Sequence, residues 1–210
     1  MYKLFKSFIL LFTCLLACNS LFSKNIDKPG NYKVSSPDGN TVFQIKNQAG
    51  NLSYSITHQK SQIIVWSALG FVYNNIEAGK QTEIVNPTSS THNEKIAWRL
   101  GENDTIYNNY NSAVFKCTDK GLRYNILVRV YNGSVAFRYQ IAQQNSDAKS
   151  GITKELTTFV FKQPLTIYQY NQESIFTPVS IDSLYKTCDF PATLTDYKNT
   201  YISIGEADNE

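Results

Sequence analysis

The 210-residue chain is poor in the side chains from which metal centres and catalytic triads are usually built. It holds only two histidines, His58 and His92, and one methionine. A centre of several histidines is therefore excluded. The chain also lacks the phosphate-binding G-x-x-x-x-G-K loop, the metal motifs H-E-x-x-H and C-x-x-C, and the nucleophile motif G-x-S-x-G. No catalytic residue is therefore assigned by motif.

Runs of basic residues are absent as well, and the formal net charge is only +3. Lys3 and Lys6 lie in an N-terminal segment that we expect to be removed, which leaves +1 for the rest of the chain. A charge this small argues against a protein that binds nucleic acid by neutralising phosphates. We therefore expect no nucleic-acid partner.

Residues 1–23 have the layout of a secretory signal. Two lysines precede the apolar stretch Phe8–Ala17, which is too short to span a bilayer core of about 30 Å. Leu15–Cys18 resembles a bacterial lipobox, in which Cys18 would carry a lipid, whereas ordinary signal peptidase would cut near Ser23. Both predict export to the periplasm or outer membrane of a Gram-negative bacterium, and the first predicts membrane attachment through Cys18.

Two cysteines, Cys117 and Cys188, remain in the predicted mature domain, residues 24–210. An oxidising compartment permits a disulfide between them. Alternatively, both are free thiols that act as small apolar side chains. Their spacing along the chain leaves both interpretations open.

What the chain does contain is apolar alternation with a period of two, as at Leu52, Tyr54 and Ile56. Trp66 lies in a short apolar run and is expected in the core, and the polar segment Asn86–Asn93 is expected to be mobile. Strands are expected at Thr41–Lys46, Leu52–Thr57, Gln62–Trp66, Ser112–Lys116, Ile152–Phe161, Thr166–Tyr170 and Thr200–Ile204. Short strands bounded by turn residues, without helices between them, predict an all-β fold, an antiparallel β-sandwich.

The clearest single prediction is a β-hairpin around Asn132-Gly133. If these two residues form a type I′ turn, the cross-strand pairs are Val130 with Val135, Val128 with Phe137, Ile126 with Tyr139 and Tyr124 with Ile141. All four pairs are apolar and share one face. A slip of one residue would turn every apolar side chain to the wrong face, so the register is strongly specified.

Candidate binding residues are few. Trp98 lies near a predicted turn with Glu102, and an indole ring can stack on the apolar face of a sugar, so these two are the candidate substrate-binding residues. Arg129 and Arg138 lie on a diagonal of the outer face of the predicted hairpin. They would form either a polar platform for a partner domain or a sugar, or ion pairs with a neighbouring strand.

Several short motifs follow one another in a set order. They are Ser36-Pro37-Asp38-Gly39, Ser67–Phe71, Trp98 with Gly101-Glu102, Asn109-Tyr110-Asn111, Arg129–Tyr139, Glu155–Phe159 and Ile204–Ala207. In this order and spacing they resemble the N-terminal domain of glycoside hydrolase family 97, exported bacterial α-glucosidases and α-galactosidases. The resemblance runs from Tyr32 to Ala207, although Ser112 stands where an acidic residue is more usual.

The resemblance implies a galactose-mutarotase-like β-sandwich that packs beside a (β/α)8 catalytic barrel. The barrel carries the carboxylates that cleave the glycosidic bond, so this chain is expected to be no enzyme on its own. It would support a site for an α-glucoside or α-galactoside. Glu206-Ala207 matches a Glu-Ala motif whose glutamate helps to hold calcium in the family. Glu206 is thereby implied as one calcium ligand, and the barrel would supply the others.

Two other functions stay open at this stage. One is a lipid-anchored β-sandwich that binds a glycan without any barrel. The other is a sugar epimerase of the same fold class, which would need His58 or His92 as part of an acid–base pair.

Overall fold

The computed structural model describes residues 30–141, 151–185, 187–198 and 200–206, so Cys18 and the predicted signal lie outside the described residues. One 3-10 helix, η1 (Ile181–Ser183), interrupts an otherwise all-strand chain in these ranges. None of the described helical structure has the length and apolar character needed to cross a bilayer. The strands are β1 (Asn31–Ser35), β2 (Thr41–Gln48), β3 (Asn51–His58), β4 (Ser61–Ala68), β5 (Phe71–Tyr73), β6 (Ile76–Ala78), β7 (Thr82–Ala97), β8 (Thr105–Asp119), β9 (Leu122–Tyr131), β10 (Ser134–Ile141), β11 (Ile152–Glu155), β12 (Thr166–Gln169), β13 (Thr177–Ser180), β14 (Ala192–Thr195) and β15 (Tyr201–Ile204).

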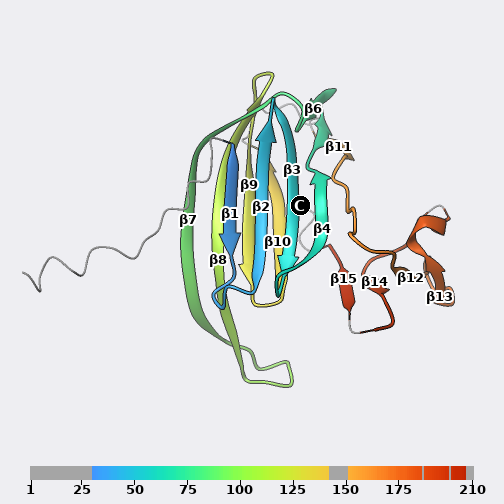
Figure 1. The fold of residues 1–210 in the computed structure, drawn as a ribbon. Helices are drawn as coiled ribbons and strands as arrows, with labels where there is room; N and C mark the ends of the chain where they lie inside the picture. Colours follow the sequence, from blue (N-terminus) through green and yellow to red (C-terminus); the bar gives the residue numbers. More distant parts are fainter. Residues whose placement is uncertain (1–29, 142–150, 186, 199, 207–210) are drawn as a thin grey trace, which may run out of the picture.

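Two antiparallel four-stranded sheets form the body of the molecule (Figure 1). The first sheet has the order β1-β2-β3-β4, and the second has the order β10-β9-β8-β7. Their inner faces share one hydrophobic core, in which the ring of Phe137 lies 6.1 Å from that of Phe43 and 5.3 Å from that of Tyr54. The predicted antiparallel β-sandwich is therefore confirmed.

The β9–β10 hairpin has the predicted register but not the predicted turn. Val130 lies opposite Val135 and Ile126 opposite Tyr139, as expected. Gly133 has φ +88°, but Asn132 does not have the positive φ that a type I′ turn requires. Instead Asn132 Oδ1 accepts a hydrogen bond from the Asp38 backbone, and the Gly133 N–H donates to Thr41 Oγ1. The β1–β2 loop therefore fixes this turn from the side.

The polar segment Asn86–Asn93, expected to be mobile, lies within a strand. It forms the middle of β7, which pairs with β8 from Thr82 to Ala97. The pairing is interrupted between Val85 and Thr88 by a bulge that contains Pro87. Polar side chains and a bulge with proline are typical of an exposed edge strand, where they prevent pairing with other chains. Polarity here therefore marks the edge of a sheet.

Trp66 is not in the core, contrary to the sequence-based expectation. It is 41% exposed, and Lys46 Nζ lies 4.3 Å from the centroid of its ring. The β3–β4 pairing shifts register on either side of Ile56, so the alternation of inner and outer side chains changes along β4. Ile64 and Ser67 are both buried in consequence, and Trp66 is turned outwards.

The expected strand Ile152–Phe161 is regular only over β11, which pairs with β5. Beyond Glu155 the chain stays extended beside β4, because Val65 N–H donates to Val160 O and Lys162 N–H to Ile63 O. The other expected strands are present as β2, β3, β4, β8, β12 and β15.

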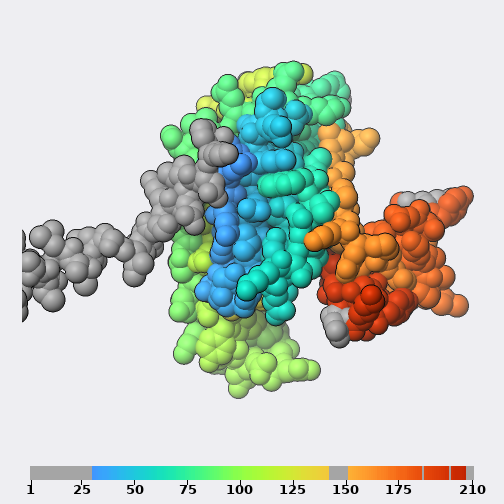
Figure 2. All heavy atoms as spheres, in the orientation of Figure 1, coloured from blue at the N-terminus to red at the C-terminus, as the bar shows by residue number. Residues whose placement is uncertain are grey.

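The last four strands form a small lobe of their own, coloured orange to red in Figure 2. Their order is β13-β12-β14-β15, and four buried residues make the centre of a second hydrophobic cluster: Leu165, Ile167, Ala192 and Leu194. Phe161 packs against both clusters and so connects the lobe to the sandwich.

Cys117 and Cys188 are both free, which decides the question left open by the sequence. Burial raises the pKa of the Cys117 thiol to about 12. Burial also raises the pKa of the core phenols Tyr54, Tyr124 and Tyr139 above their usual value. The core therefore holds four acidic groups in their neutral forms.

This arrangement predicts alkaline destabilisation. Below about pH 8.5 these groups are neutral in both folded and unfolded chains, whereas at higher pH the unfolded chain loses their protons first. The free energy of unfolding, measured with urea, should therefore stay level up to about pH 8.5 and fall as the pH rises further. Cys117→Ala should reduce this fall and Cys188→Ala should not, and a level profile to pH 11 would contradict the prediction.

Candidate functional site

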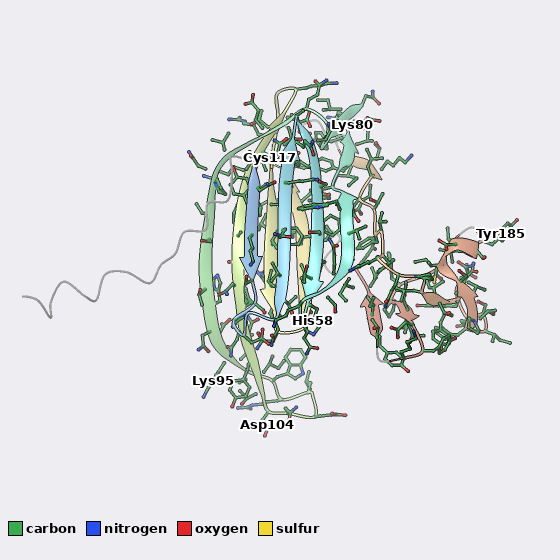
Figure 3. All side chains as sticks on the ribbon, viewed as in Figure 1. His58, Lys80, Lys95, Asp104, Cys117 and Tyr185 are labelled. Atoms are coloured by element: carbon green, nitrogen blue, oxygen red, sulfur yellow. The ribbon has the colours of Figure 1, made fainter. Side chains whose placement is uncertain are left out.

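Trp98 and Glu102 lie at the tip of a long hairpin arm. Strand β9 pairs with β8 only from Asn111 onwards, so residues 105–110 of β8 pair with β7 alone. The resulting two-stranded arm projects beyond the sandwich, and Asp104 marks its tip in Figure 3. Both candidate substrate-binding residues are thus placed on an exposed extension.

The indole of Trp98 is held against the backbone of the tip. A Cβ atom at Gly101 would lie 2.7 Å from Cδ1 of Trp98, so only glycine leaves room for this ring. The backbone N–H of Trp98 donates to the backbone oxygen of Asp104 at 2.8 Å, and Leu100 is 91% exposed at the same tip. Glu102 is exposed as well. The tip therefore exposes apolar and charged side chains together and does not enclose a binding site.

Glu206 lies two residues beyond the end of β15, in the C-terminal lobe, and is exposed. Among the described residues, no group of three or more histidine, cysteine, aspartate or glutamate side chains is close enough to hold a metal ion. Calcium takes about six to eight oxygen ligands, so this part of the chain fits the role of one ligand and not of a complete site. Ala207 lies outside the described residues.

The two histidines lie on different sheets of the sandwich, His58 on β3 and His92 on β7. His58 Nδ1 lies 3.0 Å from Thr41 Oγ1 at the end of the sandwich labelled in Figure 3. His92 lies on β7, in the second sheet. Neither hydrogen-bonds to a carboxylate in the part of the chain that the structure describes.

Sequence reasoning missed a cluster on the outer face of the second sheet, which we call the Tyr110 cluster: His92, Tyr110, Arg129 and Tyr131. The His92 ring stacks on Tyr110 at 4.5 Å and 17°. From the other side, Arg129 Cζ lies 4.9 Å and the Tyr131 ring 5.0 Å from the Tyr110 ring centroid. Tyr110 is only 7% exposed as a result, although it belongs to neither hydrophobic cluster.

Two serines border the Tyr110 cluster. Ser90 Oγ lies 3.0 Å from His92 Nε2 and 2.9 Å from Ser112 Oγ. Ser112 lies directly opposite Arg129, where an acidic residue would have formed an ion pair. Arg129 makes no ion pair with any described residue and rests on an aromatic ring instead, so the ion-pair interpretation of Arg129 was wrong. No single signal in the sequence points to this cluster, because it depends on the β7–β8 register beyond the bulge.

Comparison with known proteins decides the family. The sequence profile described as "Glycosyl-hydrolase 97 N-terminal" matches residues 34–210 of this chain. The chain belongs to glycoside hydrolase family 97, in its N-terminal domain. The expectation drawn from the motif set is thereby confirmed.

Solved structures show the same fold. A family 97 enzyme from Pseudoalteromonas sp. strain K8, in complex with panose, superposes with a TM-score of 0.74 at 23% identity, over 82% of this chain and 28% of that one. The acarbose complex of an enzyme from the same strain gives 0.68 at 24% identity, over the same shares of the two chains. A β-arabinopyranosidase gives 0.57 at 19% identity, over 67% of this chain and 23% of its own. No curated protein matches this chain.

The chain therefore spans 28% of the length of the family 97 enzymes that it resembles in structure. It corresponds to their N-terminal β-sandwich domain and not to the whole enzyme. The candidate site residues of the sequence lie in different parts of that domain: Trp98 and Glu102 on the arm beyond β7, and Glu206 in the lobe after β15.

Proposed function

We propose that this domain is the non-catalytic, carbohydrate-associated part of a family 97 α-glycosidase and supports the active site of a separate (β/α)8 catalytic domain. Hydrolysis would be carried out by that domain, on an α-glucoside or α-galactoside. The observation that carries the proposal is the surface of the C-terminal lobe. Family membership alone says which domain this is, whereas the lobe indicates where a partner would pack.

The C-terminal lobe exposes far more apolar surface than its small core can explain. Its exposed apolar and aromatic side chains are Ile175, Phe176, Tyr185, Phe190, Tyr197 and Tyr201. Surfaces of this kind mark sites of interaction with another protein or domain. Because a sheet covered on one side only is weakly stabilised, a second domain packed on this lobe would also strengthen it. The lobe is therefore the surface on which we place the catalytic domain.

Glu206 follows β15 in this same lobe, and its carboxylate is exposed. A partner that covers Tyr201 would come close to Glu206 and bring its own oxygen ligands to it. We propose that Glu206 then serves as one calcium ligand. Bound calcium would polarise a nearby oxygen, and the contribution of this chain is one fixed carboxylate.

The proposal predicts that Glu206→Gln raises the calcium concentration needed for activity without preventing this chain from binding the catalytic domain. The chain would be mixed with the separately produced catalytic part of the Pseudoalteromonas enzyme, and hydrolysis of an aryl α-glucoside would be followed while calcium is titrated. This chain alone should give no hydrolysis, and the mixture should be active. With Glu206→Gln the complex should still form, but half-maximal activity should need about tenfold more calcium.

Glu173→Gln is the matched control, because Glu173 is an exposed glutamate of the same lobe. It should leave the calcium dependence unchanged. Tyr201→Ala should instead weaken assembly, measured by size-exclusion chromatography. If Glu206→Gln and Glu173→Gln behave alike, the calcium role is wrong. If no complex forms and no activity appears, the supporting role itself is wrong.

A further inference from the structure

The outer face of the second sheet, away from the C-terminal lobe, carries an excess of positive charge. Strand β9 buries every second side chain from Leu122 to Val130, so Arg123 and Arg129 point outwards. By the same alternation the outer face holds Lys116 of β8 and Arg138 of β10. Among the described residues, the carboxylates on this face are Glu83 and Glu94 of the edge strand β7. The described cations outnumber them even without Arg138, which already has an interaction partner.

Arg129 stands near the middle of this face and makes no ion pair with any described residue. Its cross-strand neighbour is Ser112, and the guanidinium lies over the ring of Tyr110. When a guanidinium stacks on an aromatic ring, its N–H donors point outwards within the guanidinium's own plane. There they remain able to bind a carboxylate or a sulfate. Glu94, the nearer carboxylate on β7, accepts a hydrogen bond from Asn108 in the next row along the arm. The strand pairing thus leaves Arg129 available for an external anion.

The groups beside Arg129 suit a sugar chain better than a simple ion. Tyr131 and His92 present rings on either side of Tyr110, and ring faces pack on the C–H groups of sugars. The Ser90 and Ser112 hydroxyls, 2.9 Å apart, can donate to and accept from sugar hydroxyls. A cation that can bind an anion, aromatic rings and hydroxyl groups therefore lie together on one face of neighbouring strands.

We propose that the Tyr110 cluster and the cations around it bind an acidic polysaccharide, with Arg129 pairing with its carboxylate or sulfate groups. This site goes beyond the proposed support of a catalytic domain and does not depend on it, because it lies on the sandwich and not on the lobe. It would hold the enzyme on an anionic glycan while a neutral substrate is cleaved elsewhere. Binding to nucleic acid is the competing outcome, and a DNA duplex in the test below decides between the two.

The test is titration calorimetry of the full chain against four defined polymers. Polygalacturonate carries carboxylates, heparin carries sulfates, amylose is neutral, and a short DNA duplex carries phosphates. Binding to polygalacturonate, heparin or both is expected, and the pair distinguishes the two sources of the anion. Raising the salt from about 50 to about 300 mM should weaken this binding strongly, since exposed charges are screened. Equal binding to amylose, or tighter binding to DNA, would overturn the proposal.

Arg129→Gln should weaken polysaccharide binding about fivefold, the size expected for one exposed ion pair of about 1 kcal/mol. Lys46→Gln is the matched control, because Lys46 is also a cation over an aromatic ring, Trp66, but on the first sheet. It should change binding less than about twofold. Tyr131→Ala keeps the charge and should also weaken binding, which tests the ring. Equal losses in Arg129→Gln and Lys46→Gln would show a general charge effect and refute the site.

Discussion

Replacing Asp119 with alanine is expected to lower the free energy of unfolding by about 4 kcal/mol, one of the largest losses that a single change in this chain can cause. Asp119 is fully buried at the end of β8. Its Oδ2 accepts hydrogen bonds from the Gly79 and Gln81 backbones and from Thr82 Oγ1, at 2.9, 3.3 and 2.9 Å. This one oxygen therefore ties the β6–β7 connection to the β8–β9 turn.

Alanine would remove the acceptor of two buried donors, the Gly79 N–H and the Thr82 hydroxyl, and each unsatisfied buried donor costs about 1–3 kcal/mol. The Thr82 hydroxyl also lies 3.1 Å from the Tyr124 hydroxyl, so the loss would reach the centre of the core. Asp119→Asn keeps one acceptor oxygen and should lose about half as much. Asp104→Ala, at the exposed tip of the arm, is the control and should change little.

Urea unfolding followed by circular dichroism measures all three variants. A loss below about 1 kcal/mol for Asp119→Ala would show that the connection is held by other contacts. Asp119 Oδ1 is buried without a hydrogen-bond partner, so the stabilisation rests on Oδ2.

The sequence predicts those parts of this fold in which alternation and turn residues agree. The register of β9 and β10 follows from four apolar pairs, and the structure has all of them. The type I′ turn is found elsewhere, at Lys120-Gly121 and Ala49-Gly50, where both residues have positive φ. At Asn132 a side-chain contact with the β1–β2 loop overrides the local preference. Register is thus encoded by many residues, whereas turn type can be changed by one tertiary hydrogen bond.

The errors have a common cause, which is a change in the phase of the alternation. At Trp66 a register shift turns an aromatic side chain outwards, and in β7 a bulge lies within a polar segment that otherwise pairs regularly. Bulges leave little trace in a single sequence, because they depend on what the partner strand does. The Tyr110 cluster was missed for the same reason, since His92 meets Tyr110 only after the bulge in β7.

Asp119 shows a further limit of sequence reasoning. It precedes Lys120-Gly121, where an aspartate would ordinarily be taken as a solvent-exposed turn residue. The structure buries it instead, because the β6–β7 connection folds over the turn and supplies three donors. The candidate site residue Glu206, by contrast, was found through a family motif and not through any physical pattern of its own, whereas Trp98 was chosen for its place near a predicted turn.

Gly79→Ala is expected to have an effect at least as large as that of Asp119→Ala, for a steric reason. Gly79 has φ +98°, and a Cβ atom there would lie 2.1 Å from Leu69 O and 3.1 Å from Gly70 Cα. Both obstacles are backbone atoms of the buried β4–β5 connection, so neither can rotate away. The Gly79 N–H also donates to Asp119 Oδ2, and its carbonyl accepts from the Leu52 N–H at 2.8 Å. We expect a loss of more than about 4 kcal/mol, or no folded protein at all.

Gly121→Ala separates the two contributions to this loss. Gly121 has φ +86°, close to that of Gly79, but nothing lies within 4 Å of the position of its Cβ. It should therefore show only the cost of an L-residue at positive φ, about 1–2 kcal/mol. The difference between the two variants in urea unfolding, or in soluble yield if Gly79→Ala does not fold, measures the steric part. Equal losses would mean that the β4–β5 connection can move aside, and that Gly79 is required for its φ angle alone.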